Sequence, residues 1–151
     1  MAFRSLSPLP SLPAEDHAFV AVQRSANALA LQAEQVLKQF GITGVQYNVL
    51  RILRGAEPGG LACRDIGERM ISHDPDMTRL LDRLEKSGFI TRQRQTDDRR
   101  VVKTRITQKG LDLLRRLDAP VHDLHKRQFR SLSAARLRLL SSLLRQIPGD
   151  D

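Results

Sequence analysis

Apolar residues between positions 13 and 40 recur at the spacing of an α-helix. Successive apolar positions are three or four residues apart, which places them on one side of a helix. They are Phe19, Val22, Ala26, Leu29, Ala33, Val36 and Phe40. The pattern predicts one long helix that ends at Gly41.

Two shorter helices are predicted next, on either side of the turn sequence AEPGGL. The first begins at Thr43, whose hydroxyl can cap the first turn, and ends before Gly55. The second covers roughly residues 63–70.

A third short helix follows after about four residues, which is the spacing of a helix-turn-helix. Asp74 is a suitable N-cap, Pro75 fits the first helical position, and Gly88 suits the left-handed residue that ends a helix. The helical repeat puts Met77, Leu80, Leu81 and Leu84 on one side of this helix. The outward side is mostly cationic and comprises Pro75, Arg79, Asp82, Arg83 and Lys86, with Asp76 and Thr78 at its flanks.

After Gly88 the pattern changes to an alternating one. The segments FITRQR and VVKTRI alternate and are rich in β-branched residues, so they are predicted strands joined by the polar loop QTDDRR. Two further helices are predicted over residues 107–129 and 132–147. The predicted fold class is therefore mainly α with a small β-hairpin.

Length and composition indicate one domain. The chain has 151 residues, of which 40% are hydrophobic, and this suffices for a single core. Residues 1–12 are rich in proline and serine and are predicted to be a flexible arm, followed by a single domain at 13–147. We expect a cytoplasmic protein without membrane contact, because no apolar run reaches the roughly 18 residues that span a bilayer.

The charge of the chain favours a polyanionic partner. The net charge is +8, and residues 86–110 carry eight Lys or Arg against two Asp. Most charged segments are simply solvated surfaces. Here the charged segment adjoins an equally cationic helix face, so nucleic acid is the favoured partner.

Three motifs resemble those of the MarR family of winged helix-turn-helix transcription regulators. They are TRLLDRLEKSGFI (78–90), DDR (97–99) and ITQKG (106–110), in the order and spacing of that family. The resemblance covers roughly residues 14–147. It implies a DNA-binding part at 43–107 and dimerisation helices at 14–40 and 108–147. The implied homodimer places two recognition helices in successive major grooves of double-stranded DNA and two wings in flanking minor grooves.

The resemblance also assigns the wing residues. In the family, the aspartate of a wing Asp-x-Arg motif holds the arginine and aims it into the minor groove, and the matching positions are Asp97 and Arg99. A carboxylate can fix the planar guanidinium in this way, and a narrow minor groove concentrates negative potential. Arg100 is assigned to the same contact, whereas Asp98 is interpreted as a solvated turn residue.

In the recognition helix, Arg79 is the first candidate for a base contact, because arginine bridging guanine O6 and N7 is the commonest specific pairing. Thr78 and Asp76 are further candidates. Asp76 could accept from cytosine N4 or could pair with Arg79 three residues on. The predicted phosphate contacts are Arg83, Lys86, Arg92, Arg94, Lys103 and Arg105.

Other chemistry is weakly supported. Cys63 lies near a predicted helix start, where its thiol could sense oxidants, but a packing role is favoured. His122 and His125 could begin a metal site but have no third strong ligand nearby in sequence. No catalytic motif is present in the sequence, so neither an enzyme nor a cofactor is expected.

The apolar stripe of the first helix could be ordinary core. The small residues Ala26 and Ala33, together with a second stripe in the C-terminal helices, leave more apolar surface than one chain can cover, which favours a symmetric dimer.

Together with the resemblance, the sequence predicts a homodimeric repressor that binds a pseudo-palindromic operator. The resemblance adds release by a small aromatic or lipophilic effector. The alternatives are a winged module for architectural DNA packing or protein assembly, and RNA binding, which the absence of aromatic stacking residues from the predicted basic surface disfavours.

Overall fold

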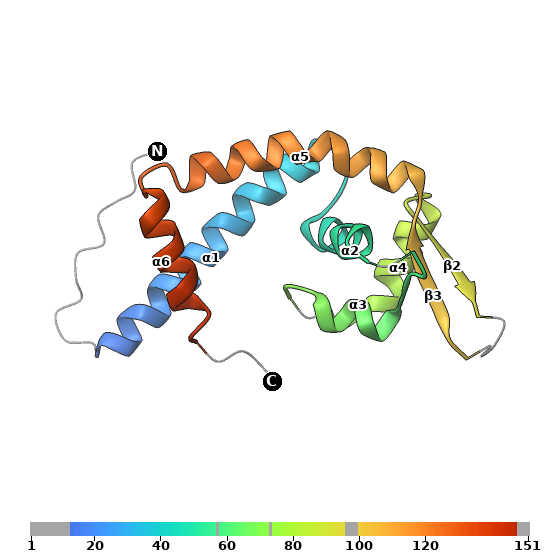
Figure 1. Ribbon diagram of the computed structural model, residues 1–151, viewed down its shortest axis with the longest axis horizontal. Helices are drawn as coiled ribbons and strands as arrows, with labels where there is room; N and C mark the ends of the chain where they lie inside the picture. The colour runs from blue at the N-terminus through green and yellow to red at the C-terminus, as the bar shows by residue number, and fades with distance from the viewer. Residues whose placement is uncertain (1–12, 57, 73, 96–99, 148–151) are drawn as a thin grey trace.

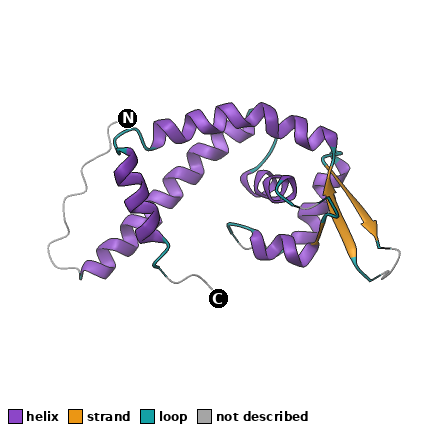
Figure 2. Ribbon diagram, viewed as in Figure 1, coloured by secondary structure: helices purple, strands orange, loops and turns teal. Residues whose placement is uncertain are grey.

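The computed structural model describes residues 13–56, 58–72, 74–95 and 100–147. The elements are α1 (Ala14–Lys38), α2 (Gly44–Arg54), β1 (Leu61–Ala62), α3 (Cys63–Arg69), α4 (Met77–Lys86), β2 (Ile90–Arg94), β3 (Val102–Ile106), α5 (Gln108–Gln128) and α6 (Ala134–Leu144). This is the predicted class, mainly α with a small β part, as Figure 2 shows. The flexible arm predicted at residues 1–12 lies outside the described residues.

The helices form two groups along the length of α5. Figure 1 shows α1 and α6 beside the C-terminal half of α5, and α2, α3, α4 and the sheet beside its N-terminal half. The second group is the winged helix-turn-helix. The single long helix α5 therefore belongs to both groups and connects them.

The sheet has three antiparallel strands in the order β1-β3-β2. The hairpin pairs Ile90 with Ile106 and Arg92 with Thr104, and β1 pairs Leu61 with Thr104. β1 was not predicted, because two residues are too short for an alternating pattern to be recognised. β3 is central, so β2 is an edge strand among the described residues.

The core lies in the winged helix-turn-helix and the adjoining part of α5. In α4 the predicted apolar side is confirmed, since Leu80, Leu81 and Leu84 are buried and Met77 packs against them. The N-terminal half of α1 is different: Phe19 keeps 65% of its surface exposed. In α6, which the structure describes completely, no residue is buried. The apolar stripes of these two helices are thus left largely uncovered by their own chain.

The start of α4 differs from the prediction. Asp76, not Asp74, is the N-cap, and its carboxylate accepts from the backbone N–H of Arg79 at 3.2 Å. Asp74 instead accepts from the backbone N–H of Asp76 at 2.8 Å and so shapes the turn before the helix. Pro75 consequently precedes the helix, and residues 70–76 connect α3 to α4, a longer connection than expected. Either aspartate is a good cap by residue type, and the turn geometry decides between them.

The ITQKG motif joins α5 to the end of α4. Thr107 is the N-cap of α5, and its hydroxyl accepts from Gly110 N–H at 3.2 Å and donates to the Gly88 carbonyl at 2.7 Å. The ammonium of Lys109 donates to the Ser87 carbonyl at 2.7 Å. Carbonyls that the end of α4 leaves unpaired are therefore satisfied by the first turn of α5.

We expect Gly110→Ala to lower the free energy of unfolding by about 1–3 kcal/mol. A Cβ at this position would lie 2.5 Å from the Phe89 carbonyl oxygen and 2.7 Å from Cγ1 of Ile106. Urea denaturation measures the change. The control is Gly67→Ala in α3, where a Cβ meets no atom within 4 Å. That change should be neutral or stabilising by up to about 1 kcal/mol, and an equal loss in both variants would refute the packing argument.

Removing the cap of α4 should also be measurable. Asp76→Ala is expected to cost about 1 kcal/mol, whereas Asp76→Asn keeps a capping oxygen and should cost no more than a few tenths. Asp123→Ala removes an exposed ion pair with Lys126 in mid-helix and serves as control, with a change within about 0.5 kcal/mol. Thermal unfolding of the three variants checks that Asp76→Ala is the least stable of them. Equal losses of stability in the two Asp76 variants would contradict the capping role.

Candidate nucleic-acid interface

The outward face of α4 is cationic. Thr78, Arg79, Arg83 and Lys86 are all exposed. Asp82 was predicted on this face, but it is half-buried and turned toward β2, where it pairs with an arginine. The face is therefore more positive than the sequence suggested.

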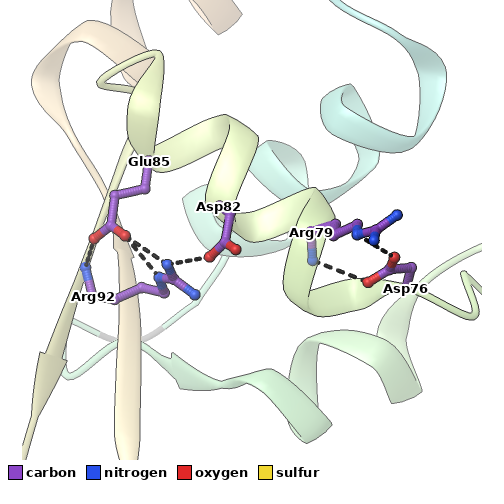
Figure 3. A network of polar contacts seen from close by, with 5 residues as sticks. All are labelled: Asp76, Arg79, Asp82, Glu85 and Arg92. Atoms are coloured by element: carbon purple, nitrogen blue, oxygen red, sulfur yellow. Dashed lines mark hydrogen bonds and ion pairs between the residues drawn. The ribbon is translucent and has the colours of Figure 1, made fainter.

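Asp76 holds the first arginine of this face. Oδ2 of Asp76 lies 3.2 Å from Nε of Arg79, while Oδ1 caps the helix. Figure 3 shows both contacts at the start of α4. Of the two roles considered for Asp76, the ion pair is present in the structure. The Arg79 side chain is still 82% exposed, so its guanidinium is oriented without being covered.

The hairpin carries cations on both of its faces. The register pairs Gln93 with Lys103 and Thr91 with Arg105, which puts Lys103 and Arg105 on one face of the sheet. Arg105 is exposed and its Nη1 donates to Oε1 of Gln93 at 3.3 Å. Lys103 is half-exposed.

The opposite face of the hairpin, where Arg92 lies, also carries Arg94 near the end of the strand. Arg94 is exposed, and so is Arg100 beyond the loop. The predicted minor-groove pair Asp97 and Arg99, with Asp98 between them, lies outside the described residues.

Arg92 differs from the other predicted phosphate contacts. Its Nε and Nη2 donate to Oε2 of Glu85 at 2.9 and 2.7 Å, and Nη2 also donates to Oδ1 of Asp82 at 2.5 Å. The side chain is only 25% exposed. The hydrogen bond to Glu85 is the main reason that the pKa of Arg92 is raised above its ordinary value, against the opposing effect of burial. Its guanidinium is thus directed toward α4, not outward toward solvent.

Sequence reasoning missed Glu85 altogether. A usable signal was present: Arg92 is two residues after buried Ile90 in the strand, so both side chains lie on the face of the sheet that packs against α4. On that side, Asp82 and Glu85 are one helical turn apart and present two carboxylates to the strand.

The structure also places the remaining candidate residues, which are one cysteine and two histidines. Cys63 is a free thiol, half-buried and packed against the core, as the packing interpretation expected. His122 and His125 are exposed on α5, and among the described residues no group of three His, Cys, Asp or Glu could hold a metal ion. No helix in the described part of the chain is long and apolar enough to cross a membrane.

Comparisons with known proteins agree with this geometry. The sequence model of the MarR family matches residues 42–102. The HTH-type transcriptional regulator FarR of Neisseria gonorrhoeae is 29% identical over 124 residues, which are 82% of this chain and 84% of that protein.

Solved structures give the same result over nearly the whole chain. The MarR transcription factor from Planctomyces limnophilus is 35% identical, with a TM-score of 0.69 over 90% of this chain and 98% of its own. A MarR mutant from E. coli in complex with operator DNA is 24% identical and shares the fold, with a TM-score of 0.77 over 85% of this chain and 91% of its own. The chain therefore belongs to the MarR family of transcriptional regulators.

Proposed function

We propose that this protein is a repressor that binds a pseudo-palindromic DNA operator as a homodimer and blocks access to the promoter. One observation carries the proposal: the exposed cations of α4 and those of the hairpin lie on adjacent elements of the winged helix-turn-helix. We call this cationic part of the molecule the basic lobe. A helix of this kind fits the major groove, and a hairpin beside it reaches the neighbouring minor groove. The operator complex of the E. coli relative supports the partner class.

Within the proposal, each cation has a role. Arg79, held by Asp76, reads a base edge, with Thr78 beside it. The phosphate contacts are Arg83, Lys86, Arg94, Lys103 and Arg105. Arg92 leaves this set because its guanidinium is engaged with two carboxylates. Asp97, Arg99 and Arg100 keep the minor-groove role that the sequence motif assigns.

The second chain of the dimer would cover the apolar surface of α1 and α6. Phe19 of α1 and Leu139 of α6 are 65% and 59% exposed, and Leu143 near the end of α6 and Ile147 just beyond it are exposed as well. An apolar groove of about 900 Å³ runs between α1, the end of α5 and α6. So much uncovered apolar surface favours a second copy of the chain related by a two-fold axis. The two winged helix-turn-helix units of such a dimer would bind half-sites about 34 Å apart.

The effector and the cellular location complete the proposal. A small aromatic or lipophilic effector would bind between the dimerisation helices and the DNA-binding part. Linkage requires that such an effector and the operator weaken each other's binding equally. Binding to a chromosomal operator implies action in the cytoplasm.

Selection of bound sites from a random duplex pool tests the function. Recovery of an inverted repeat would support the repressor. Binding of random duplex nearly as tight as that of any selected site would favour the architectural alternative.

Replacing single cations should separate base reading from phosphate contact. We expect Arg79→Ala to weaken operator binding by about 1–3 kcal/mol and to relax the preference at one position of each half-site. Lys86→Ala should instead weaken operator and random duplex alike and reduce the salt slope by about one per chain. Titrations from 50 to 200 mM salt on both duplexes distinguish the two. Uniform loss in Arg79→Ala would remove it from the base-reading role.

The dimer proposal is tested on α6. The double variant Leu139→Glu, Leu143→Glu should dissociate the dimer, because it places charges in the apolar surface that the partner would cover. Sedimentation should then give the single-chain mass of 17.0 kDa. Ser142→Glu, an exposed polar position on the same helix, is the control and should remain dimeric. A wild-type protein of 17.0 kDa at micromolar concentration would refute the proposal.

A further inference from the structure

Arg92 joins the hairpin to α4 through side chain and backbone at once. Its guanidinium reaches Oε2 of Glu85 and Oδ1 of Asp82, while its backbone N–H donates to Oε1 of Glu85 at 3.1 Å. Glu85 therefore uses both carboxylate oxygens on one residue of β2. Figure 3 shows this cluster between the helix and the strand.

The backbone contact satisfies an N–H group that would otherwise lack a partner in the sheet, because β2 is the edge strand of the described sheet. Its outward N–H groups receive no partner from the ladder. Glu85 supplies an acceptor to one of them, so the strand is fixed to the helix at its main chain. On the central strand of the sheet, Thr104 lies opposite Arg92 and is buried.

The two carboxylates should lower the affinity of the protein for a polyanion. Asp82 and Glu85 are 42% and 38% exposed and lie on the proposed recognition helix, where they would repel phosphate. One guanidinium neutralises only one of these two charges. Their placement is explained if they hold the hairpin at a defined angle to the helix, since the planar guanidinium of an arginine fixes the geometry of the carboxylates that it joins.

We propose that Glu85, Asp82 and Arg92 form a clamp that sets the position of the wing relative to the recognition helix. The clamp fixes the distance between the major-groove and minor-groove contacts of each chain. Arg92 is thus a positioning residue and not a DNA contact. This inference rests on the proposed function, because it assigns a role within DNA recognition.

Glu85→Gln tests the clamp, because the clamp and simple electrostatics predict opposite changes in operator affinity. The variant removes a negative charge next to the DNA surface, so charge alone predicts tighter binding of every duplex. The clamp predicts weaker operator binding by roughly tenfold, because glutamine keeps one acceptor oxygen where glutamate has two. Binding to random duplex should stay unchanged or tighten, so the specificity ratio falls.

Footprinting gives a second readout that a loss of overall stability would not produce. In Glu85→Gln, protection of the minor groove beside each half-site should weaken, while protection of guanine N7 in the major groove persists. Arg92→Lys should lose part of the operator affinity and part of the minor-groove protection, because its single ammonium on a flexible stem cannot reproduce the paired Nε and Nη2 contacts with Glu85.

Glu68→Gln is the matched control. Glu68 pairs with Arg64 within α3, so this variant removes the same charge without breaking a contact between elements. It should retain the specificity ratio. Operator binding by Glu85→Gln as tight as or tighter than wild type, or unchanged minor-groove protection, would overturn the clamp.

The outcomes also separate the clamp from the proposed function. A wild-type protein that selects no operator refutes the proposed function. A specific wild type with an equally specific Glu85→Gln refutes only the clamp. If Glu85→Gln is unfolded by thermal melting, Arg92→Lys carries the test, and full specificity with full minor-groove protection in that variant overturns the clamp.

Discussion

The hydrogen bond from the Thr107 hydroxyl to the Gly88 carbonyl is the contact on which the rest of the arrangement depends. It joins the end of α4 to the start of α5, and Lys109 reinforces it on the preceding carbonyl. Gly110 allows the helix to approach Phe89 closely. Because α5 also belongs to the group containing α1 and α6, this joint determines how the winged helix-turn-helix is held with respect to those two helices.

Carboxylates in this basic lobe serve to orient arginines. Asp76 both starts α4 and holds Arg79, and the pair Asp82 and Glu85 holds Arg92 against the helix. Each carboxylate reduces the attraction for phosphate while fixing a side chain that would otherwise have many conformations. Specific recognition requires defined positions as well as charge, and this lobe combines the two.

The sequence predicts most of the fold because helical and alternating periods are local properties. The buried side of α4 followed from helical spacing, and the two hairpin strands followed from alternation together with their β-branched residues. The start of α4 did not, because two aspartates were equally good caps by type and only the turn geometry selects Asp76. The partners of Arg92 were missed because they come from a different element, α4. Composition does not distinguish an arginine that is free to contact phosphate from one that is paired with carboxylates.

The length of α5 has a mechanical consequence. Its 21 residues span about 31 Å at 1.5 Å per residue, with the joint to α4 at one end and the hydrogen bond from Gln128 to the Leu29 carbonyl of α1 near the other. For a rigid rod of that length, a tilt of only about 2° at one end displaces the opposite end by roughly 1 Å. A small change in how α5 packs against α1 would therefore move α4 and the hairpin at the opposite end of this helix.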